Sequence, residues 1–229
     1  MNQTFIVKAH HDSSPRIRVY LLLAVLCISS FFNNAYTEEI DPEAVQALVD
    51  QVTPAMLIRL EAGEVISENT ARDSGGGSRA ARGTVFMIFD VTPEEAWPYL
   101  SDHMAYAAYM PHLLSVEEYE TREPGQGVKQ SLKIAWKKLK YHIVQQYDAE
   151  AYVVHWYLDP DKENDVKESR GYWKLIPHGE KQSIVIYSVD VDSGMRVPAF
   201  IENYMLRSDL PGVVLAMEKR IETKGEYKK

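Results

Sequence analysis

Histidine and acidic side chains are the groups in this sequence that could perform acid–base or metal chemistry, and their spacing favours neither. The histidines beyond the N-terminal segment are scattered, without a ligand spacing such as H-E-x-x-H. They are His103, His112, His142, His155 and His178. His112 and His155 are the two that could reach a pocket. No nucleophile elbow, phosphate loop or dinucleotide fingerprint occurs. The sequence therefore predicts no cofactor and identifies no catalytic residue.

The acidic run Asp159–Asp165 begins like a calcium-binding loop. Such a loop needs glycine at its sixth position and a carboxylate at its twelfth. Asn164 and Arg170 stand at those two positions. The run is therefore typical of a solvated turn, and the sequence predicts no metal site.

Bulky aromatic and methionine side chains offer a different chemistry, that of an apolar pocket with a few polar tips. Tyrosine and tryptophan combine a large apolar ring with one hydrogen-bonding group, which suits a pocket that holds one polar end of an apolar ligand. The same residues also fill ordinary cores, so each is either cavity wall or core. The candidates are Trp136, Tyr141, Trp156, Trp173, Tyr187, Tyr204 and Met205.

Two further features belong to the candidate pocket. The short-helix region forms an adaptable apolar group, which is either a portal or packing beneath a long helix. Its residues are Met104, Tyr106, Tyr109 and Met110. Gly171 lies inside an expected strand, where glycine marks the close approach of backbone or ligand, or a bulge.

Charge and cysteine content exclude several classes of protein. The chain has 229 residues with a net charge of −8, and residues 1–35 are net basic, so the remainder is more acidic still. An acidic domain repels phosphate backbones, and we expect no nucleic-acid partner. The single cysteine, Cys27, lies in the N-terminal apolar run. The rest of the chain thus has no disulfide scaffold, thiolate zinc site or cysteine nucleophile.

The N-terminal segment predicts an exported protein. Arg16 and Arg18 precede the apolar run Val19–Phe32, which is shorter than the ~20 residues of a membrane span and fits a signal sequence. We expect residues 1–35 to be a cleaved signal peptide ending at Ala35, and the protein to be periplasmic or secreted. The alternatives are an uncleaved membrane anchor through residues 19–32, or a lipoprotein, although Leu26 stands where a lipoprotein needs a small residue before Cys27.

Residues 36–78 predict a helical lead-in that packs on the main domain. Asp41 and Pro42 are typical of a helix start, a second short helix covers 55–60, and Gly63 can take a left-handed cap. A short strand at 65–66 and a Gly/Ser-rich linker or hairpin tip at 74–78 follow. This segment is too small to be stable alone.

Residues 79–224 predict one α+β domain, followed by a charged tail at 225–229. A strand over 84–91 leads to a helix that begins with a capping box formed by Thr92 and Glu95. A short helix over 101–109 comes next. Six strands separated by short turns follow, and then an amphipathic helix over 198–222 with a kink at Pro211. The short turns predict a curved antiparallel sheet of about seven strands around the long C-terminal helix.

Several stretches of this domain resemble the START-like, Bet v 1-like superfamily and its bacterial polyketide cyclase/dehydrase and coenzyme Q-binding branch. They are V-T-P-E-E-A-W at 91–97 with L-S-D at 100–102, the Tyr106–His112 region with Val116, G-Y-W-K-L at 171–175, and 196–211 at the entry to the last helix. Residues 55–66 resemble a lead-in of some bacterial members. The resemblance implies a helix-grip fold with a deep cavity for lipids, quinones, sterols or polyketides, and no universal catalytic residue.

Three functions follow from this resemblance. The first is a non-catalytic carrier or sensor of a hydrophobic small molecule or lipid in the cell envelope. The second is a cyclase, dehydratase or isomerase that uses the same cavity, and the third is an interaction module whose cavity is filled. The basic cluster W-K-K-L-K at 136–140 either makes transient contact with lipid head groups or is the charged tip of a strand pair.

Overall fold

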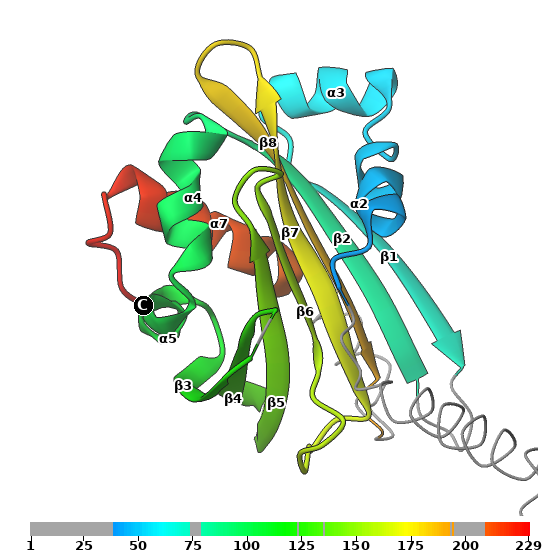
Figure 1. Ribbon diagram of the computed structural model, residues 1–229. Coiled ribbons are helices and arrows are strands. Elements are labelled where there is room, and N and C mark those ends of the chain that lie inside the picture. The colour runs from blue at the N-terminus through cyan, green and yellow to red at the C-terminus, as the bar shows by residue number, and fades with distance from the viewer. Residues whose placement is uncertain (1–38, 74–78, 123, 135, 193, 195–208) are drawn as a thin grey trace, which may run out of the picture. The chain divides into compact units, whose positions relative to one another are not determined.

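The computed structural model describes residues 39–73, 79–122, 124–134, 136–192, 194 and 209–229 (Figure 1). The predicted signal peptide and the candidates Tyr204 and Met205 lie outside these residues. Among the described helices, none combines the length and the hydropathy that a membrane span requires.

One antiparallel sheet of eight strands forms the centre of the domain. Its order is β1-β2-β8-β7-β6-β5-β4-β3, so that β2 and β8, which are far apart in the chain, are neighbours. The strands are β1 Ile66–Asp73, β2 Arg79–Phe89, β3 Leu113–Thr121, β4 Gln126–Ile134, β5 Lys137–Asp148, β6 Val153–Leu158, β7 Glu168–His178 and β8 Gln182–Asp192. Buried and less buried residues alternate along β7, as expected of a strand with two different faces.

The expected count of about seven strands is corrected to eight by β1. The sequence indicated a strand only at 65–66, but β1 runs to Asp73 and pairs along its whole length with β2. Residues Ser67–Thr70 are polar and do not show the apolar alternation that predicts a strand. Because β1 is an edge strand held by backbone hydrogen bonds to β2, its sequence does not need alternating apolar side chains.

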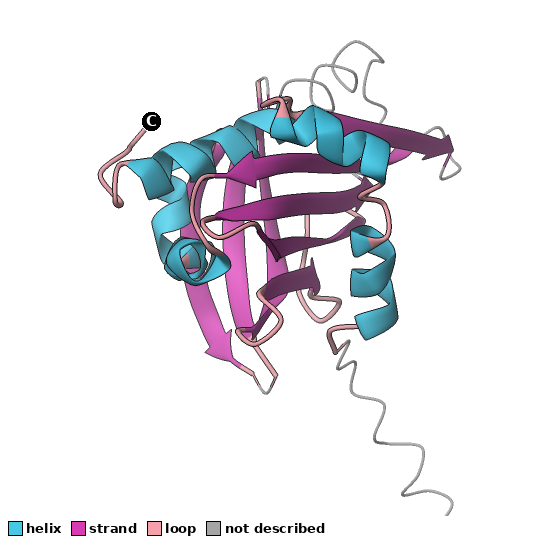
Figure 2. Ribbon diagram, turned by 90° about the horizontal axis from the view of Figure 1, so that it is seen from above, coloured by secondary structure: helices cyan, strands magenta, loops and turns pink. Residues whose placement is uncertain are grey.

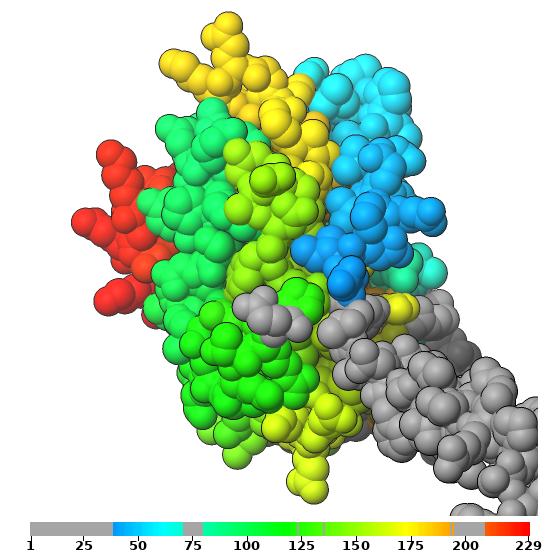
Figure 3. All heavy atoms as spheres, in the orientation of Figure 1, coloured from blue at the N-terminus to red at the C-terminus, as the bar shows by residue number. Residues whose placement is uncertain are grey.

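Two N-terminal helices cover one face of the sheet. α2 (Pro42–Val49) and α3 (Pro54–Glu61) lie beside β1 and β2 in Figure 1, and Figure 3 shows them as a blue and cyan layer. Gly63 ends α3 with φ +83°, as the sequence predicted. The buried side chains of this layer are Leu48, Met56 and Leu60 from the helices and Ile66, Phe86, Ile184 and Ile186 from the strands.

The opposite face is covered by the remaining helices (Figure 2). They are α4 (Pro93–Ser101), the 3-10 turn η1 (His103–Ala105), α5 (Tyr106–Tyr109) and α7 (Leu210–Glu222). The predicted capping box is confirmed, since the Thr92 amide donates to Glu95 at 3.1 Å and the Glu95 amide to Thr92 at 3.4 Å. α7 buries Val214, Met217 and Ile221 in the same core as Leu100 of α4.

The described part of the C-terminal helix starts later than expected. α7 begins at Leu210, and the first half of the predicted helix, 198–208, lies outside the described residues. Pro211 occupies the first turn of α7, a position that favours proline, and the helix before the predicted kink lies outside the described residues. After the helix, the Lys229 ammonium donates to the carbonyl oxygens of Met110 (2.6 Å) and Leu113. The C-terminal residues are thereby held against α5.

Candidate ligand cavity

A cavity of about 280 Å³ lies between the sheet and the helices α5 and α7. Its lining comes from strands β2 to β8, with β3 contributing Leu113 at its start, and α5, the turn after it and the start of α7 lie on its helical side. The lining is mainly aliphatic and aromatic. This volume is close to the lower end of the range for small-molecule sites.

Strand alternation decides which side chains face the cavity. On β5 the inward residues are Leu139, Tyr141, Ile143 and Gln145, each two positions from the next. Register then aligns the neighbouring strands. Trp156 of β6 pairs with Gln145, and Trp173 of β7 pairs with Tyr187 of β8. The inward positions of adjacent strands therefore form one continuous surface.

Six of the predicted site residues line this cavity, four from the strands and two from α5 and the turn after it. They are Tyr106, Met110, Tyr141, Trp156, Trp173 and Tyr187. The rings of Trp173 and Tyr187 are 4.3 Å apart, and those of Trp156 and Tyr187 are stacked at 5.8 Å. Three large rings from adjacent strands thus make one aromatic wall.

The other described candidates lie elsewhere. Tyr109 is 1% exposed and points at α7, where its hydroxyl donates to the Met217 sulfur at 3.6 Å. Trp136 is not among the lining residues; it stands in the turn between β4 and β5 with 80% of its surface exposed. In a turn the regular alternation of side chains between the two faces of a strand ends, so Trp136 can point into solvent.

Gly171 also stands outside the lining, next to Trp156. A Cβ atom at Gly171 would lie 2.4 Å from Cζ2 of Trp156 and 2.3 Å from the Ser188 carbonyl oxygen. The close approach that the sequence suggested is therefore made by the ring of Trp156 and by the β8 backbone. Gly171 leaves the space that this cavity-lining ring occupies.

The two histidines singled out by the sequence separate onto opposite faces. His112 lines the cavity, has φ +61°, and its Nε2 lies 3.3 Å from Oδ1 of Asp209 at the start of α7. His155 points to the other face, where it is completely buried and stacks on Tyr172 at 4.5 Å. The pair of His112 and Asp209 links the turn before β3 to α7 at the helical side of the cavity.

Hydroxyl and amide groups supply the polarity of the interior. Tyr106 donates to the Leu100 carbonyl at 2.5 Å, and Tyr141 donates to Oε1 of Gln130 at 3.0 Å. Burial raises the pKa of the Tyr141 and Tyr187 hydroxyls, so both rings stay neutral. Both side chains nevertheless keep some accessible surface. That surface faces the cavity rather than bulk water.

The sequence alone did not identify four polar residues of the lining, Gln130, Gln145, Ser169 and Asp209. A signal was present, because Gln145 has the same strand parity as Tyr141. Glutamine in a strand is ordinarily taken as facing solvent. Among the described residues, no group of three or more potential metal-ligating side chains comes together. The site is an apolar space with a few polar tips and the pair of His112 and Asp209 at its helical side, and it can hold an apolar molecule and orient one end of it.

Comparison with known proteins agrees with this geometry. The family model described as "Polyketide cyclase / dehydrase and lipid transport" matches residues 80–222. The chain belongs to that family. The predicted START-like, Bet v 1-like relationship and the helix-grip fold are thereby confirmed.

Solved structures show the same fold at low sequence identity. An aromatase/cyclase from Streptomyces sp. R1128 is 13% identical, with a TM-score of 0.54 over 69% of this chain and 96% of its own. A STAR-related lipid transfer protein from Xanthomonas axonopodis is 16% identical, with a TM-score of 0.51 over 70% and 98%. A START superfamily protein from Mycobacterium smegmatis is also 16% identical, with a TM-score of 0.50 over 71% and 99%. A search of the curated proteins gave no match.

Proposed function

We propose that this protein binds and carries an apolar small molecule or lipid in its internal cavity without transforming it. The observation that carries the proposal is the cavity itself, about 280 Å³ of space lined by aliphatic and aromatic side chains. An empty apolar space costs packing energy, and a ligand of matching shape restores the lost contacts. The ligand is quinone-, sterol- or polyketide-like, in keeping with the family to which the chain belongs.

The N-terminal segment supports an extracytoplasmic site of action. Its basic residues and 14-residue apolar run are those of a secretory signal. We therefore place the carrier in the cell envelope, where an apolar ligand needs a protein to shield it during passage through water. N-terminal sequencing of the mature protein tests this location.

Transient contact with a membrane would let the carrier load and release its ligand. The turn between β4 and β5 carries the exposed Trp136, and Lys133 and Lys138 face each other across the two strands. Like charges in such a pair repel unless an anion lies near. Ile134 and Leu139, beside the turn, line the cavity. The turn is thus suited to anionic head groups next to the ligand site.

A cyclase or dehydratase is the second candidate, favoured by the pair of His112 and Asp209. Both residues line the cavity, so an acid–base pair would face a bound polyketide. Mass spectrometry of the molecule that co-purifies with the protein separates the two functions. A carrier returns an added ligand unchanged, whereas an enzyme changes its mass or its ring structure.

Filling the cavity tests the carrier function directly. Leu132 lines the cavity, and Leu114 on the neighbouring strand is 44% exposed, so Leu132→Trp and Leu114→Trp make the same change inside and outside. We expect Leu132→Trp to abolish both the co-purifying ligand and the fluorescence of the apolar probe N-phenyl-1-naphthylamine. Leu114→Trp should leave both intact. Equal probe binding by the two folded variants would refute the proposal.

A further inference from the structure

We infer that the cavity recognises a hydroxyl group on its ligand, an alcohol or a phenol, through the side-chain amide of Gln145. The inference rests on the proposed function and names the ligand class of the same site. Gln145 lies on β5 among the inward-facing residues, and its strand partner is Trp156. Only 2% of its surface is exposed.

The amide of Gln145 is incompletely paired. Its Oε1 atom is buried and has no hydrogen-bond partner among the residues that the structure describes. A buried polar atom without a partner costs free energy, because it has given up water and gained nothing. A well-packed strand would place leucine or valine here. Glutamine is understandable if a bound molecule completes its hydrogen bonds.

The second glutamine of the cavity shows the contrast. Gln130 lies on β4, and its Oε1 accepts the hydroxyl proton of Tyr141 at 3.0 Å. Gln130 is thus satisfied by the protein alone, whereas Gln145 is not. The two residues share one side-chain type and one cavity, which makes them a matched pair for experiment.

The chemistry of the partner follows from the surroundings. Oε1 is an acceptor and needs a donor, which excludes an ether or a ketone. The walls near Gln145 are Ile143, Trp156 and Tyr187, none of which carries a charge. The carboxylate of Asp209 also lines the cavity but is paired with His112, so a charged donor beside Gln145 would be buried without a counter-charge of its own. A hydroxyl is neutral, donates to the amide oxygen and also accepts from the amide nitrogen. The ligand is therefore an apolar molecule that buries a hydroxyl-bearing end.

A pair of probes that differ in one hydrogen-bond donor tests the inference. An apolar cavity of about 150 Å³ holds benzene, so this one has room for the two fused rings of 2-naphthol or 2-methoxynaphthalene. Calorimetric titration of the wild type should show 2-naphthol binding about three- to tenfold more tightly than its methyl ether. Gln145→Leu should bring that ratio to about one by weakening 2-naphthol alone. Gln182→Leu, which changes a glutamine that is not among the lining residues and that bonds Asp90 instead, should preserve the ratio.

Thermal melting without ligand gives a second, independent readout. Gln145→Leu removes an unpaired acceptor, so its melting temperature should equal or exceed that of the wild type. Gln130→Leu breaks a bond within the protein and should melt lower. An unchanged probe ratio in Gln145→Leu, or a loss of melting temperature as large as that of Gln130→Leu, would overturn the role of Gln145 and leave the carrier function standing. Failure of both probes to bind the wild type would overturn both proposals.

Discussion

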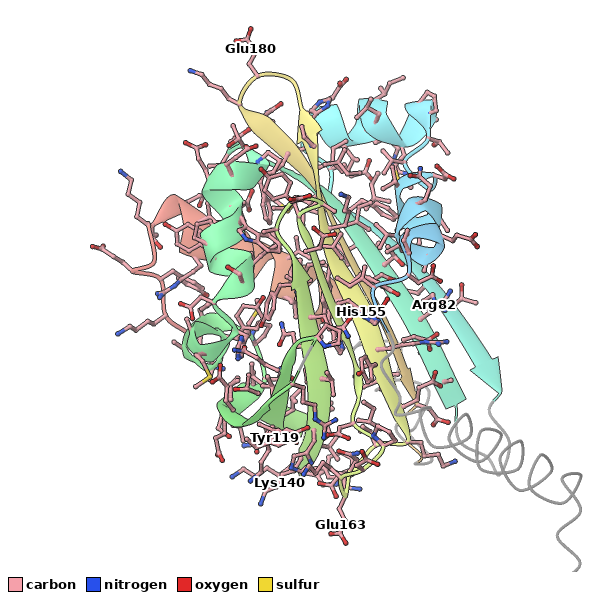
Figure 4. The ribbon with its side chains drawn as sticks, in the orientation of Figure 1. Arg82, Tyr119, Lys140, His155, Glu163 and Glu180 are labelled. Carbon is pink, nitrogen blue, oxygen red and sulfur yellow. The ribbon has the colours of Figure 1, made fainter. Side chains whose placement is uncertain are left out.

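Replacing His155 with phenylalanine should make the fold less sensitive to acid. His155 lies on β6, on the face away from the cavity (Figure 4), and is completely buried. Burial, reinforced by the charge of Arg170 and opposed by Asp41, lowers the pKa of its imidazole from 6.5 to about 4. The folded protein therefore holds this ring neutral at a pH where the unfolded chain protonates it.

The sign and size of the effect follow from the two pKa values. Between pH 6.5 and 4 the unfolded state binds the extra proton, so stability is lost as the pH falls through this window. The full difference, at about 1.4 kcal/mol per pKa unit, is worth roughly 3 kcal/mol below pH 4. At pH 5, where the unfolded ring is protonated and the folded ring is neutral, the loss is about 2 kcal/mol.

Urea unfolding of the wild type and of His155→Phe at pH 8 and pH 5 measures this contribution. Other titrating groups affect both proteins alike, so the difference between their two pH-dependent losses isolates His155. Phenylalanine keeps a ring to stack on Tyr172 and removes Nε2, which has no partner among the described residues, but it also gives up the long 3.5 Å contact between Nδ1 and Oε1 of Gln146. The variant should thus match the wild type within about 1 kcal/mol at pH 8. Equal losses on going to pH 5 would refute a buried neutral imidazole.

Three further changes have defined outcomes. Gly171→Ala should lower the free energy of unfolding in urea by about 1–3 kcal/mol, because the new Cβ displaces Trp156. Gly212→Ala is the control, since the nearest atom to its new Cβ is 3.9 Å away, and it should not lower that free energy. Similar losses of stability in the two variants would contradict the contact between residue 171 and Trp156. Burial, with the nearby charges of Glu222 and Asp90, raises the pKa of Glu218 from 4.5 to about 7, so its carboxylate removes stability as the pH rises from 4.5 through 7. Glu218→Gln should therefore raise the melting temperature by about 2–4 °C at pH 8, a figure that allows for solvent screening, and leave it unchanged at pH 4. A shift of the same size at both pH values would disprove the raised pKa of Glu218. Trp136→Ala should reduce co-sedimentation with phosphatidylglycerol-containing vesicles several-fold. Ile58→Ala removes another exposed side chain (69% exposed) and should not reduce it. Wild-type binding by both variants would rule out membrane docking at the turn between β4 and β5.

Local structure was predictable from the sequence where short-range chemistry decides it. The capping box of Thr92 and Glu95 and the left-handed Gly63 are confirmed, because each depends on residues within one helical turn. The curved antiparallel sheet and the family relationship are confirmed as well. Strand β1 was predicted only at its start, because its polar edge residues carry no alternating pattern.

The sequence also indicated which residues of a strand share a face, but it did not reveal what covers that face. Helices cover both faces of this sheet, α2 and α3 on one side and α4, α5 and α7 on the other. Period-two alternation is the same for a face against a filled core and a face against a cavity. His112 and Gln145 reach the cavity, and His155 does not, because α4, α5 and α7 lie over one face of the sheet and α2 and α3 over the other. That distribution depends on contacts between distant segments, which only the tertiary structure fixes.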